Sequence, residues 1–321
     1  MGDFCRGIKN AMLFVGTVVG AGFATGQEIA LYFKGCDFLT VILSSAFLAL
    51  FAFLFLSSGK IEIKSPILFH AYKAVMLIST VTVFGIMMAG TEELFRDYIG
   101  LEYIGILFGI TCLLITAKGL DATKNTNLIL VPILVVMIAV VAIKKGSFTI
   151  CGQPKIFSGI GYAAMNMLFS GELMRKCGKE ENRKNNLITA VFVFVMILLL
   201  ITFMKLCIDG AETKSLPFVY QANQLGVGGF AFVAVALSIF TTMLSCGKIS
   251  QDNLRDYWRK APPYTVSFAV FAVGAFVSVF EFSSLINTVY PITSYMGIGL
   301  CIVFFFSLIF NRNKINLPID K

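Results

Sequence analysis

Apolar residues run in long segments along the whole chain, and polar residues gather in the short stretches between them. A membrane-spanning helix needs about 20 mostly apolar residues. About ten segments of this kind can be delimited, at residues 7–33, 37–57, 67–95, 101–117, 127–143, 157–174, 187–208, 228–250, 264–282 and 285–310. The pattern predicts an all-α integral membrane protein with about ten transmembrane helices, forming a single transmembrane domain over residues 1–321.

Glycines interrupt the first segment. Gly16, Gly20, Gly22 and Gly26 lie within it, and each costs about 1 kcal/mol relative to alanine in a helix interior. Thr25-Gly-Gln-Glu28 has the form of a capping box, which marks a helix start. We therefore expect two half-helices that meet at membrane depth, where unwound backbone is tolerated only if it is buried in protein or lines a watery cavity. The alternative is a packing face of small residues in an unbroken helix.

The charged residues predict an orientation. Most of the 26 Lys and Arg residues fall on the side of the N-terminus when the segments are counted as alternating crossings. The positive-inside rule then places both termini in the cytoplasm of a multi-pass protein of the cytoplasmic membrane. This distribution accounts for the net charge of +8, so we expect membrane lipid as a partner and no nucleic acid.

Composition argues against an enzyme. A mean hydropathy of +0.84 and a hydrophobic fraction of 57% exclude a pair of soluble domains. The 8 cysteines stand singly, and His70 is the sole histidine. The sequence has no nucleophile–base pair, metal-ligand cluster or phosphate-binding loop. We therefore expect neither catalysis nor a cofactor.

The second half of the chain repeats features of the first. Division into five plus five spans gives halves at about 7–145 and 155–310, inverted relative to each other because each holds an odd number of spans. At one constant offset Gly16 matches Gly161, and Thr25-Gly26 matches Ser170-Gly171. Glycine-interrupted spans in corresponding positions point to the binding site of an inverted-repeat transporter, so the sixth helix is also expected to be broken. Asn166 at mid-span needs a polar partner, which could instead be an interhelical hydrogen bond.

The motif GAGFATGQE at residues 20–28 resembles the first-span motif of the amino acid permease family in the amino acid–polyamine–organocation superfamily. The resemblance covers nearly the whole chain. It implies the LeuT-type fold with broken first and sixth helices. It also implies that spans one, two, six and seven move as a bundle against a scaffold of spans three, four, eight and nine.

The resemblance further implies a Na⁺ site between carbonyls at the first-span break and hydroxyls on the eighth span. Ser238, Thr241 and Thr242 share one helical face, and Gly16 and Val19 would supply carbonyls. Hard cations prefer oxygen ligands. The alternative is that the hydroxyls bond to carbonyls of the preceding turn.

Proton-coupled relatives carry a lysine in the fifth span instead of the ion. Lys124, at the edge of this span, is the candidate here, and coupling to H⁺ stays open.

The expected substrate site lies between the two broken helices. Half-helix ends would meet the carboxylate of a small amino acid, and unwound carbonyls near Val18, Val19, Ala164 and Met165 would meet its ammonium. The expected binding residues are Val19, Gly20, Ala21, Gly22, Phe23, Ala164, Asn166, Phe169, Ser170 and Gly171. Phe240 could add an apolar wall. Glu28 and Glu172 are interpreted as capping residues in preference to proton carriers, and the substrate is expected to be neutral.

These expectations together favour a secondary active transporter for a small amino acid or similar solute, working by alternating access and coupled to Na⁺. The alternative is a ligand-sensing membrane subunit, because spore germination permeases resemble this fold and bind nutrients as receptor components.

Overall fold

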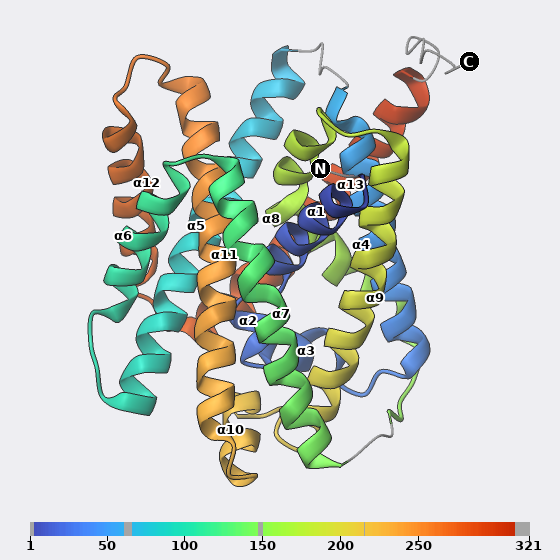
Figure 1. Ribbon diagram of the computed structural model, residues 1–321, viewed down its shortest axis with the longest axis vertical. Coiled ribbons are helices and arrows are strands. Elements are labelled where there is room, and N and C mark those ends of the chain that lie inside the picture. The colour runs from blue at the N-terminus through green and yellow to red at the C-terminus, as the bar shows by residue number, and fades with distance from the viewer. Residues whose placement is uncertain (1–2, 61–65, 147–149, 215, 312–321) are drawn as a thin grey trace.

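The computed structural model describes residues 3–60, 66–146, 150–214 and 216–311, and these residues are almost entirely helical (Figure 1). Every predicted span contains a helix. The helices are α1 (Asp3–Val18), α2 (Ala21–Ala24), α3 (Gln27–Phe33), α4 (Phe38–Ser57), α5 (Pro66–Ile99), α6 (Ile104–Thr116), α7 (Leu120–Lys145), α8 (Ile156–Gly178), α9 (Arg183–Ile208), α10 (Pro217–Gln224), α11 (Gly228–Tyr257), α12 (Pro263–Val277) and α13 (Phe282–Asn311).

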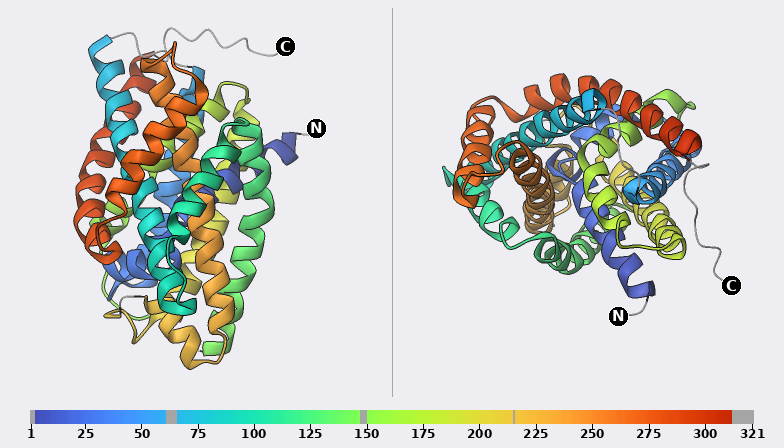
Figure 2. Two further views of the ribbon diagram at one scale, coloured as in Figure 1. Left: turned by 90° about the vertical axis from the view of Figure 1, so that its left-hand side faces the viewer. Right: turned by 90° about the horizontal axis from the view of Figure 1, so that it is seen from above.

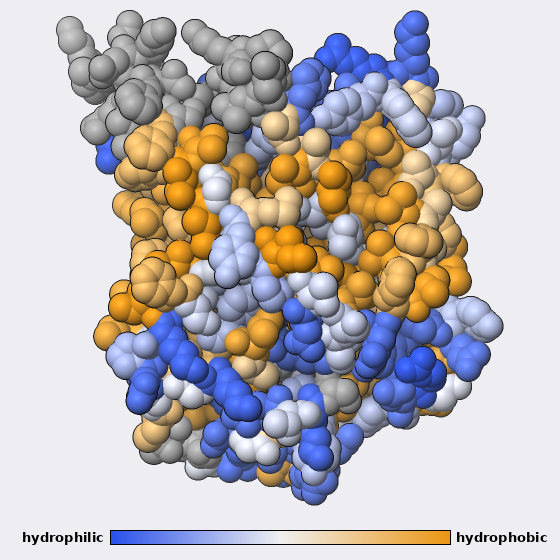
Figure 3. All heavy atoms as spheres, turned by 180° about the vertical axis from the view of Figure 1, so that it is seen from behind, coloured by the Kyte–Doolittle hydropathy of each residue, from blue (hydrophilic) through white to orange (hydrophobic). Residues whose placement is uncertain are grey.

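Among the described residues, 6 helices are long and apolar enough to cross a membrane. These are α4, α5, α7, α9, α11 and α13, while α6 and α12 are shorter apolar helices. Figure 3 shows a broad apolar band on one face of the molecule, with polar residues gathered toward the ends. The all-α membrane architecture is confirmed. The number of crossings, the inverted repeat and the orientation of the termini stay predictions.

The first span is broken, as its glycines predict. Helix α1 ends at Val18, Gly20 is extended, and α2 makes about one turn before the chain reaches Gly26. Gly26 has φ of 88°, in the left-handed region that glycine adopts without a steric penalty. The Phe218 amide of α10 donates to the Thr25 carbonyl at 2.9 Å, which helps to satisfy the interrupted backbone.

The capping box predicted at this break is wrong. Helix α3 begins after Gly26 without a side-chain cap, and the Thr25 hydroxyl instead donates to the Gly22 carbonyl at 3.3 Å. The break therefore depends on glycine conformation and on backbone contacts from α10.

The sixth span is not broken, so that expectation is wrong. Helix α8 runs without interruption from Ile156 to Gly178. The polar groups that suggested a break bond within the helix: Asn166 Nδ2 donates to the Tyr162 carbonyl at 3.0 Å, and the Ser170 hydroxyl to the Asn166 carbonyl at 2.6 Å. Glycines of α8 serve close packing instead, and Gly171 lies directly against the ring of Phe55 in α4.

The helices form two groups that meet at the broken first span. Helices α1, α4, α8 and α9 pack together, and α5, α6, α11 and α12 pack together. The right-hand view of Figure 2, along the bundle, shows α1 crossing the interior. Helix α1 begins and α13 ends toward one end of the bundle, while α10 lies at the opposite end (Figure 1). The broken span thus lies where both groups can contact it.

Candidate functional site

Two hydroxyl groups of α11 reach the carbonyls exposed by the break. The Ser238 hydroxyl donates to the carbonyl oxygens of Val19 and Gly20, the latter at 2.9 Å. The Thr242 hydroxyl lies 3.0 Å from the Gly16 carbonyl oxygen and 3.1 Å from that of Thr17. Both side chains are buried. Because these bonds join different helices, the alternative of hydroxyls satisfied within their own helix does not hold for Ser238 and Thr242.

Thr241 follows the alternative instead, because its hydroxyl bonds within its own helix. Its hydroxyl lies 2.9 Å from the Ser238 carbonyl oxygen, one turn back in the same helix. The five residues proposed for Na⁺ (the oxygen cluster), Gly16, Val19, Ser238, Thr241 and Thr242, are all buried. Of their three hydroxyls, those of Ser238 and Thr242 contact carbonyls of the break. Carbonyl and hydroxyl oxygens are the donors that hard cations use. No group of three His, Cys, Asp or Glu that could hold a metal occurs in the described parts of the chain.

Asn127 is a buried neighbour of this cluster that the sequence interpretation missed. Its Oδ1 lies 2.6 Å from the position that a Cβ at Gly16 would take. The side chain is fully buried, and neither its Oδ1 nor its Nδ2 has a hydrogen-bond partner among the described residues. The fifth span was predicted to begin at residue 127, whereas α7 begins at Leu120. An amide that was placed at a boundary thus lies two turns inside the helix.

The α2 side of the expected substrate site is closed and internally bonded. Ala21, Gly22 and Phe23 are buried. The Ala21 amide lies 3.3 Å from Met87 Sδ of α5, and the Phe23 amide bonds to the carboxyl group of Glu28. The Ala21 and Phe23 amides, two of the backbone donors expected to meet a substrate carboxylate, are therefore occupied by the chain itself.

The α8 side presents side chains rather than unwound backbone. Phe169 packs on Tyr290 of α13, with ring centroids 5.9 Å apart. Gly297 of α13 lies directly against the Ala164 carbonyl. Because α8 is continuous, Ala164 and Met165 offer no unwound carbonyls, and Ser170 and Gly171 form no helix N-terminus. These expected backbone roles are corrected accordingly.

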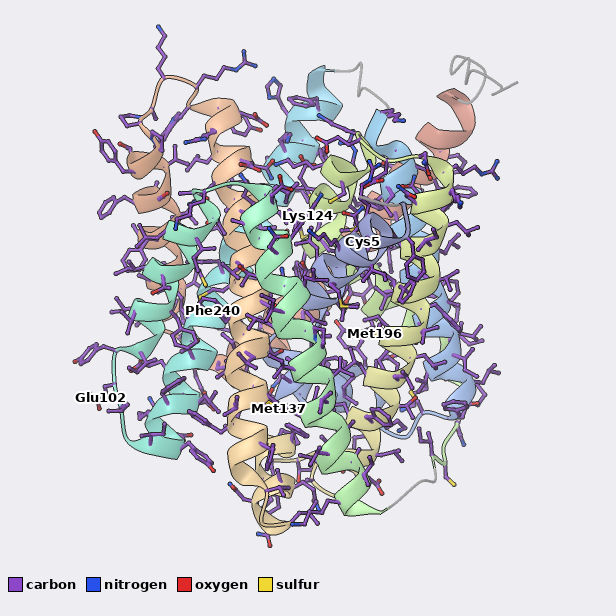
Figure 4. The ribbon with its side chains drawn as sticks, viewed as in Figure 1. Cys5, Glu102, Lys124, Met137, Met196 and Phe240 are labelled. Carbon is purple, nitrogen blue, oxygen red and sulfur yellow. The ribbon has the colours of Figure 1, made fainter. Side chains whose placement is uncertain are left out.

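Three other side chains lie away from this site. Phe240 packs against Phe108 of α6, with ring centroids 5.5 Å apart, so it is no wall of the site (Figure 4). Lys124 lies in the second turn of α7, near its start, and interacts with Cys177 (Figure 4). Glu172 lies inside continuous α8, caps no helix start, and pairs with Lys73 of α5.

Comparison with known proteins identifies a relative and a fold. No family model matches the chain. The uncharacterized membrane protein YkvI of Bacillus subtilis (strain 168) is 24% identical over 329 residues, covering 90% of this chain and 92% of that protein.

Several solved transporters share the architecture. Mhp1, a nucleobase-cation-symport-1 family transporter in a closed conformation with bromovinylhydantoin bound, matches with a TM-score of 0.64 at 12% identity, covering 90% of this chain and 77% of Mhp1. MhsT in complex with L-phenylalanine matches with a TM-score of 0.65 at 14% identity, covering 93% and 87%. A manganese transporter of Eremococcus coleocola matches with a TM-score of 0.63 at 11% identity, covering 94% and 78%. The chain has the LeuT-type fold of these transporters.

Proposed function

We propose that the chain is a secondary active transporter that moves a small amino acid or similar solute across the cytoplasmic membrane by alternating access, coupled to Na⁺. The LeuT-type fold supports transport as the general activity. The observation that supports Na⁺ as the coupling ion is the contact of the Ser238 and Thr242 hydroxyls with carbonyls of the broken first span.

The position of the oxygen cluster suggests how Na⁺ would act. Gly16 and Val19 belong to the group of α1, α4, α8 and α9, whereas the hydroxyls belong to α11 in the other group. Each of the three hydroxyls donates its hydrogen to a carbonyl oxygen. When Na⁺ binds, the hydroxyl and carbonyl oxygens would all turn their lone pairs to the ion, and the ion would tie the two groups together. Na⁺ binding would thereby favour one arrangement of the groups, which is the differential affinity that coupling requires.

The solute would bind beside this cluster, between α2 and α8. Val19 and Gly20 contribute to the ion cluster and immediately precede α2, so ion binding and solute binding share one stretch of backbone. The bound molecules of MhsT and Mhp1, L-phenylalanine and bromovinylhydantoin, support a small organic substrate here.

The test is uptake by proteoliposomes that contain the purified protein. Pooled labelled amino acids are supplied with an inward Na⁺ gradient or with K⁺ in its place. Thr241→Ala and Thr242→Ala are compared with Thr111→Ala, whose hydroxyl, like that of Thr241, bonds to the preceding turn of its own helix, at an exposed position of α6. We expect Na⁺-driven uptake in the wild type and in Thr111→Ala, with strong loss in the two other variants.

Other outcomes distinguish the alternatives. Uptake that does not depend on Na⁺ and is unchanged in the α11 variants would contradict Na⁺ coupling but would still support transport. Saturable binding without uptake would favour the ligand-sensing subunit.

A further inference from the structure

Glu28 places a buried carboxyl group at the break in the first span. It lies in the first turn of α3, and only 2% of the residue is exposed. Its Oε1 lies 2.6 Å from the position that a Cβ at Gly22 would take, so the carboxyl folds back over α2. It accepts hydrogen bonds from the Tyr290 hydroxyl and the Phe23 amide, while Oε2 has no partner among the described residues.

Among the described residues, no basic side chain forms an ion pair with this carboxyl. Within the described parts of the chain, Glu28 takes part in no ion pair, in contrast to the similarly buried Glu172, which pairs with Lys73, Arg175 and Lys176. A carboxylate inside a membrane protein is costly without a cationic partner. The Glu28 carboxyl group, which has no ion-pair partner among the described residues, is therefore placed to bind a cationic group of the solute.

A cluster of aromatic side chains lies near the carboxyl, because Tyr32 follows Glu28 by one turn of α3 and both Tyr32 and Tyr162 interact electrostatically with Glu28. The rings of Tyr32 and Tyr162 lie 5.6 Å apart, and the Phe33 ring lies 5.1 Å from that of Tyr162. The Tyr32 hydroxyl is 2.6 Å from Ser294 Oγ, and Tyr162 is fully buried. Aromatic faces beside a carboxylate attract organic cations through the ring quadrupole.

Glu28 is continuous with the residues proposed to bind the solute. It contacts Gly22 and Phe23 of α2 directly, and Tyr290 connects it to Phe169 of α8. The continuity of α8 removes the unwound carbonyls of Ala164 and Met165 that were expected to meet an ammonium, and the Val19 carbonyl at the first-span break is bonded to Ser238. The Phe23 amide is already bonded to Glu28. The site therefore offers a carboxyl group where the sequence suggested a receptor for a carboxylate.

We propose that Glu28, with Tyr290 and the neighbouring aromatic rings, binds the ammonium group of the solute, and that the substrates are organic amines or amino acids recognised chiefly through their ammonium. This rests on the proposed transport function. It replaces the expectation of a neutral substrate, since a ligand without a carboxylate would carry a net positive charge.

Matched ligands that differ in one charged group test the proposal. The first set is L-phenylalanine, phenethylamine and 3-phenylpropionate, and the second is L-leucine, isoamylamine and 4-methylpentanoate. Binding to the purified full-length protein is measured by isothermal calorimetry, and uptake is measured in proteoliposomes. The variants are Glu28→Gln and Glu28→Asp. The control is Glu102→Gln, at an exposed carboxylate in the loop before α6 (Figure 4).

We expect at least one amine to bind and its matched acid not to bind. Glu28→Gln should weaken amine binding at least about tenfold, Glu28→Asp should weaken it less, and Glu102→Gln should leave it unchanged. Glutamine has the shape of glutamate and introduces no charge, so the variant should remain folded, and its elution profile and melting curve verify this.

Several results would overturn the proposal. The proposal is wrong if the acids bind as well as their matched amines. It is also wrong if amine binding is unchanged in Glu28→Gln. If Glu28→Gln removes only the pH dependence of uptake and no amine binds, Glu28 carries a proton instead. If Glu28→Gln leaves Na⁺-driven amino acid uptake intact, the result contradicts this inference and is consistent with the proposed function. Absence of binding and uptake for every probe would remove both.

Discussion

Lys73 Nζ lies 2.9 Å from Glu172 Oε1, and the two side chains are only 8% and 5% exposed. The same Nζ lies 2.9 Å from Asn253 Oδ1 and 3.0 Å from Asp256 Oδ2. One lysine of α5 thus joins α8 to α11. Since α8 belongs to one group of helices and α5 and α11 to the other, this pair holds the two groups together on the side of the site where α8 ends.

Removal of one partner of this pair should destabilise the protein and loosen that end. Lys73→Met leaves the Glu172 carboxylate buried near fewer cations, and breaking a buried pair costs about 3–5 kcal/mol. We expect a lower melting temperature in detergent. We also expect faster maleimide labelling of Cys177, a buried free cysteine near the end of α8, in a background that lacks the exposed Cys5 and Cys151.

The exposed pair between Arg96 and Asp97 provides the control. Its atoms lie 3.3 Å apart with side chains 55% and 49% exposed, and pairs of this kind contribute about 0–1 kcal/mol. Arg96→Gln should leave melting and Cys177 labelling almost unchanged. Equal effects of Arg96→Gln and Lys73→Met would contradict a specific tie between the groups.

Asp37 makes the start of α4 sensitive to acid. Its Oδ1 accepts bonds from the Thr40 hydroxyl at 2.7 Å and the Thr40 amide at 2.9 Å. These bonds, the hydroxyl first, lower the pKa of the Asp37 carboxyl from its ordinary value. Because the pKa is lower in the folded state, the cap stabilises the helix start above about pH 4. The stabilisation is lost as the pH falls through the folded-state pKa.

Hydrogen exchange at the Thr40 amide measures this effect. In the wild type, protection at Thr40 should fall as the pH decreases below about 4, after correction for the intrinsic exchange rate. Asp37→Asn keeps an oxygen acceptor without a titrating group, so its corrected protection should not change with pH in this range. An identical pH dependence in both proteins would show that another group titrates there.

The sequence predicted the structure where local conformational free energy or residue spacing determines it. Glycines lower the stability of a helix interior, and the chain breaks around Gly20. Ser238 and Thr242 lie on one face of a helix because residues three and four apart are neighbours, and both reach the break. The membrane fold follows from segment length and hydropathy.

The sequence was less informative wherever the answer depended on distant neighbours. Glycine and serine at Gly171 and Ser170 suggest a break, but they fit an intact helix equally well once Phe55 of α4 packs against Gly171. Lys73 and Glu172 lie far apart in sequence, so no local pattern pairs them. The capping box was predicted because Glu28 follows Thr25 by three residues. In the fold, the Glu28 carboxyl instead turns back toward Gly22.

Gly22→Ala should displace the Glu28 carboxyl. A Cβ at this position would lie 2.6 Å from Glu28 Oε1 and 2.8 Å from its Cγ, both too close for ordinary contacts. We expect a loss of about 1–3 kcal/mol in the free energy of unfolding, together with weaker binding of whichever probe the wild type binds. Calorimetry and melting curves measure the two effects.

Gly299→Ala is the matched control, since nothing lies within 4 Å of a Cβ there. Alanine should stabilise α13 at this position by about 0.5–1 kcal/mol and leave binding unchanged. Normal binding in Gly22→Ala would show that the contact between Gly22 and Glu28 is not required at the site.

Asn127→Leu should separate stability from ion binding. The side chain is fully buried beside Gly16, and its polar atoms lack partners among the described residues. An apolar side chain of similar size removes an unsatisfied amide, whose burial costs about 1–3 kcal/mol. Without Na⁺ we therefore expect the variant to melt at or above the wild-type temperature.

If Asn127 Oδ1 contributes to the oxygen cluster around Gly16, the wild type should be stabilised by NaCl relative to KCl, and the variant should lose most of that difference. Asn125→Leu, two residues earlier at an exposed position bonded to Lys9, should keep it. A variant that melts well below the wild type would instead show that the amide holds the packing of α7 on α1.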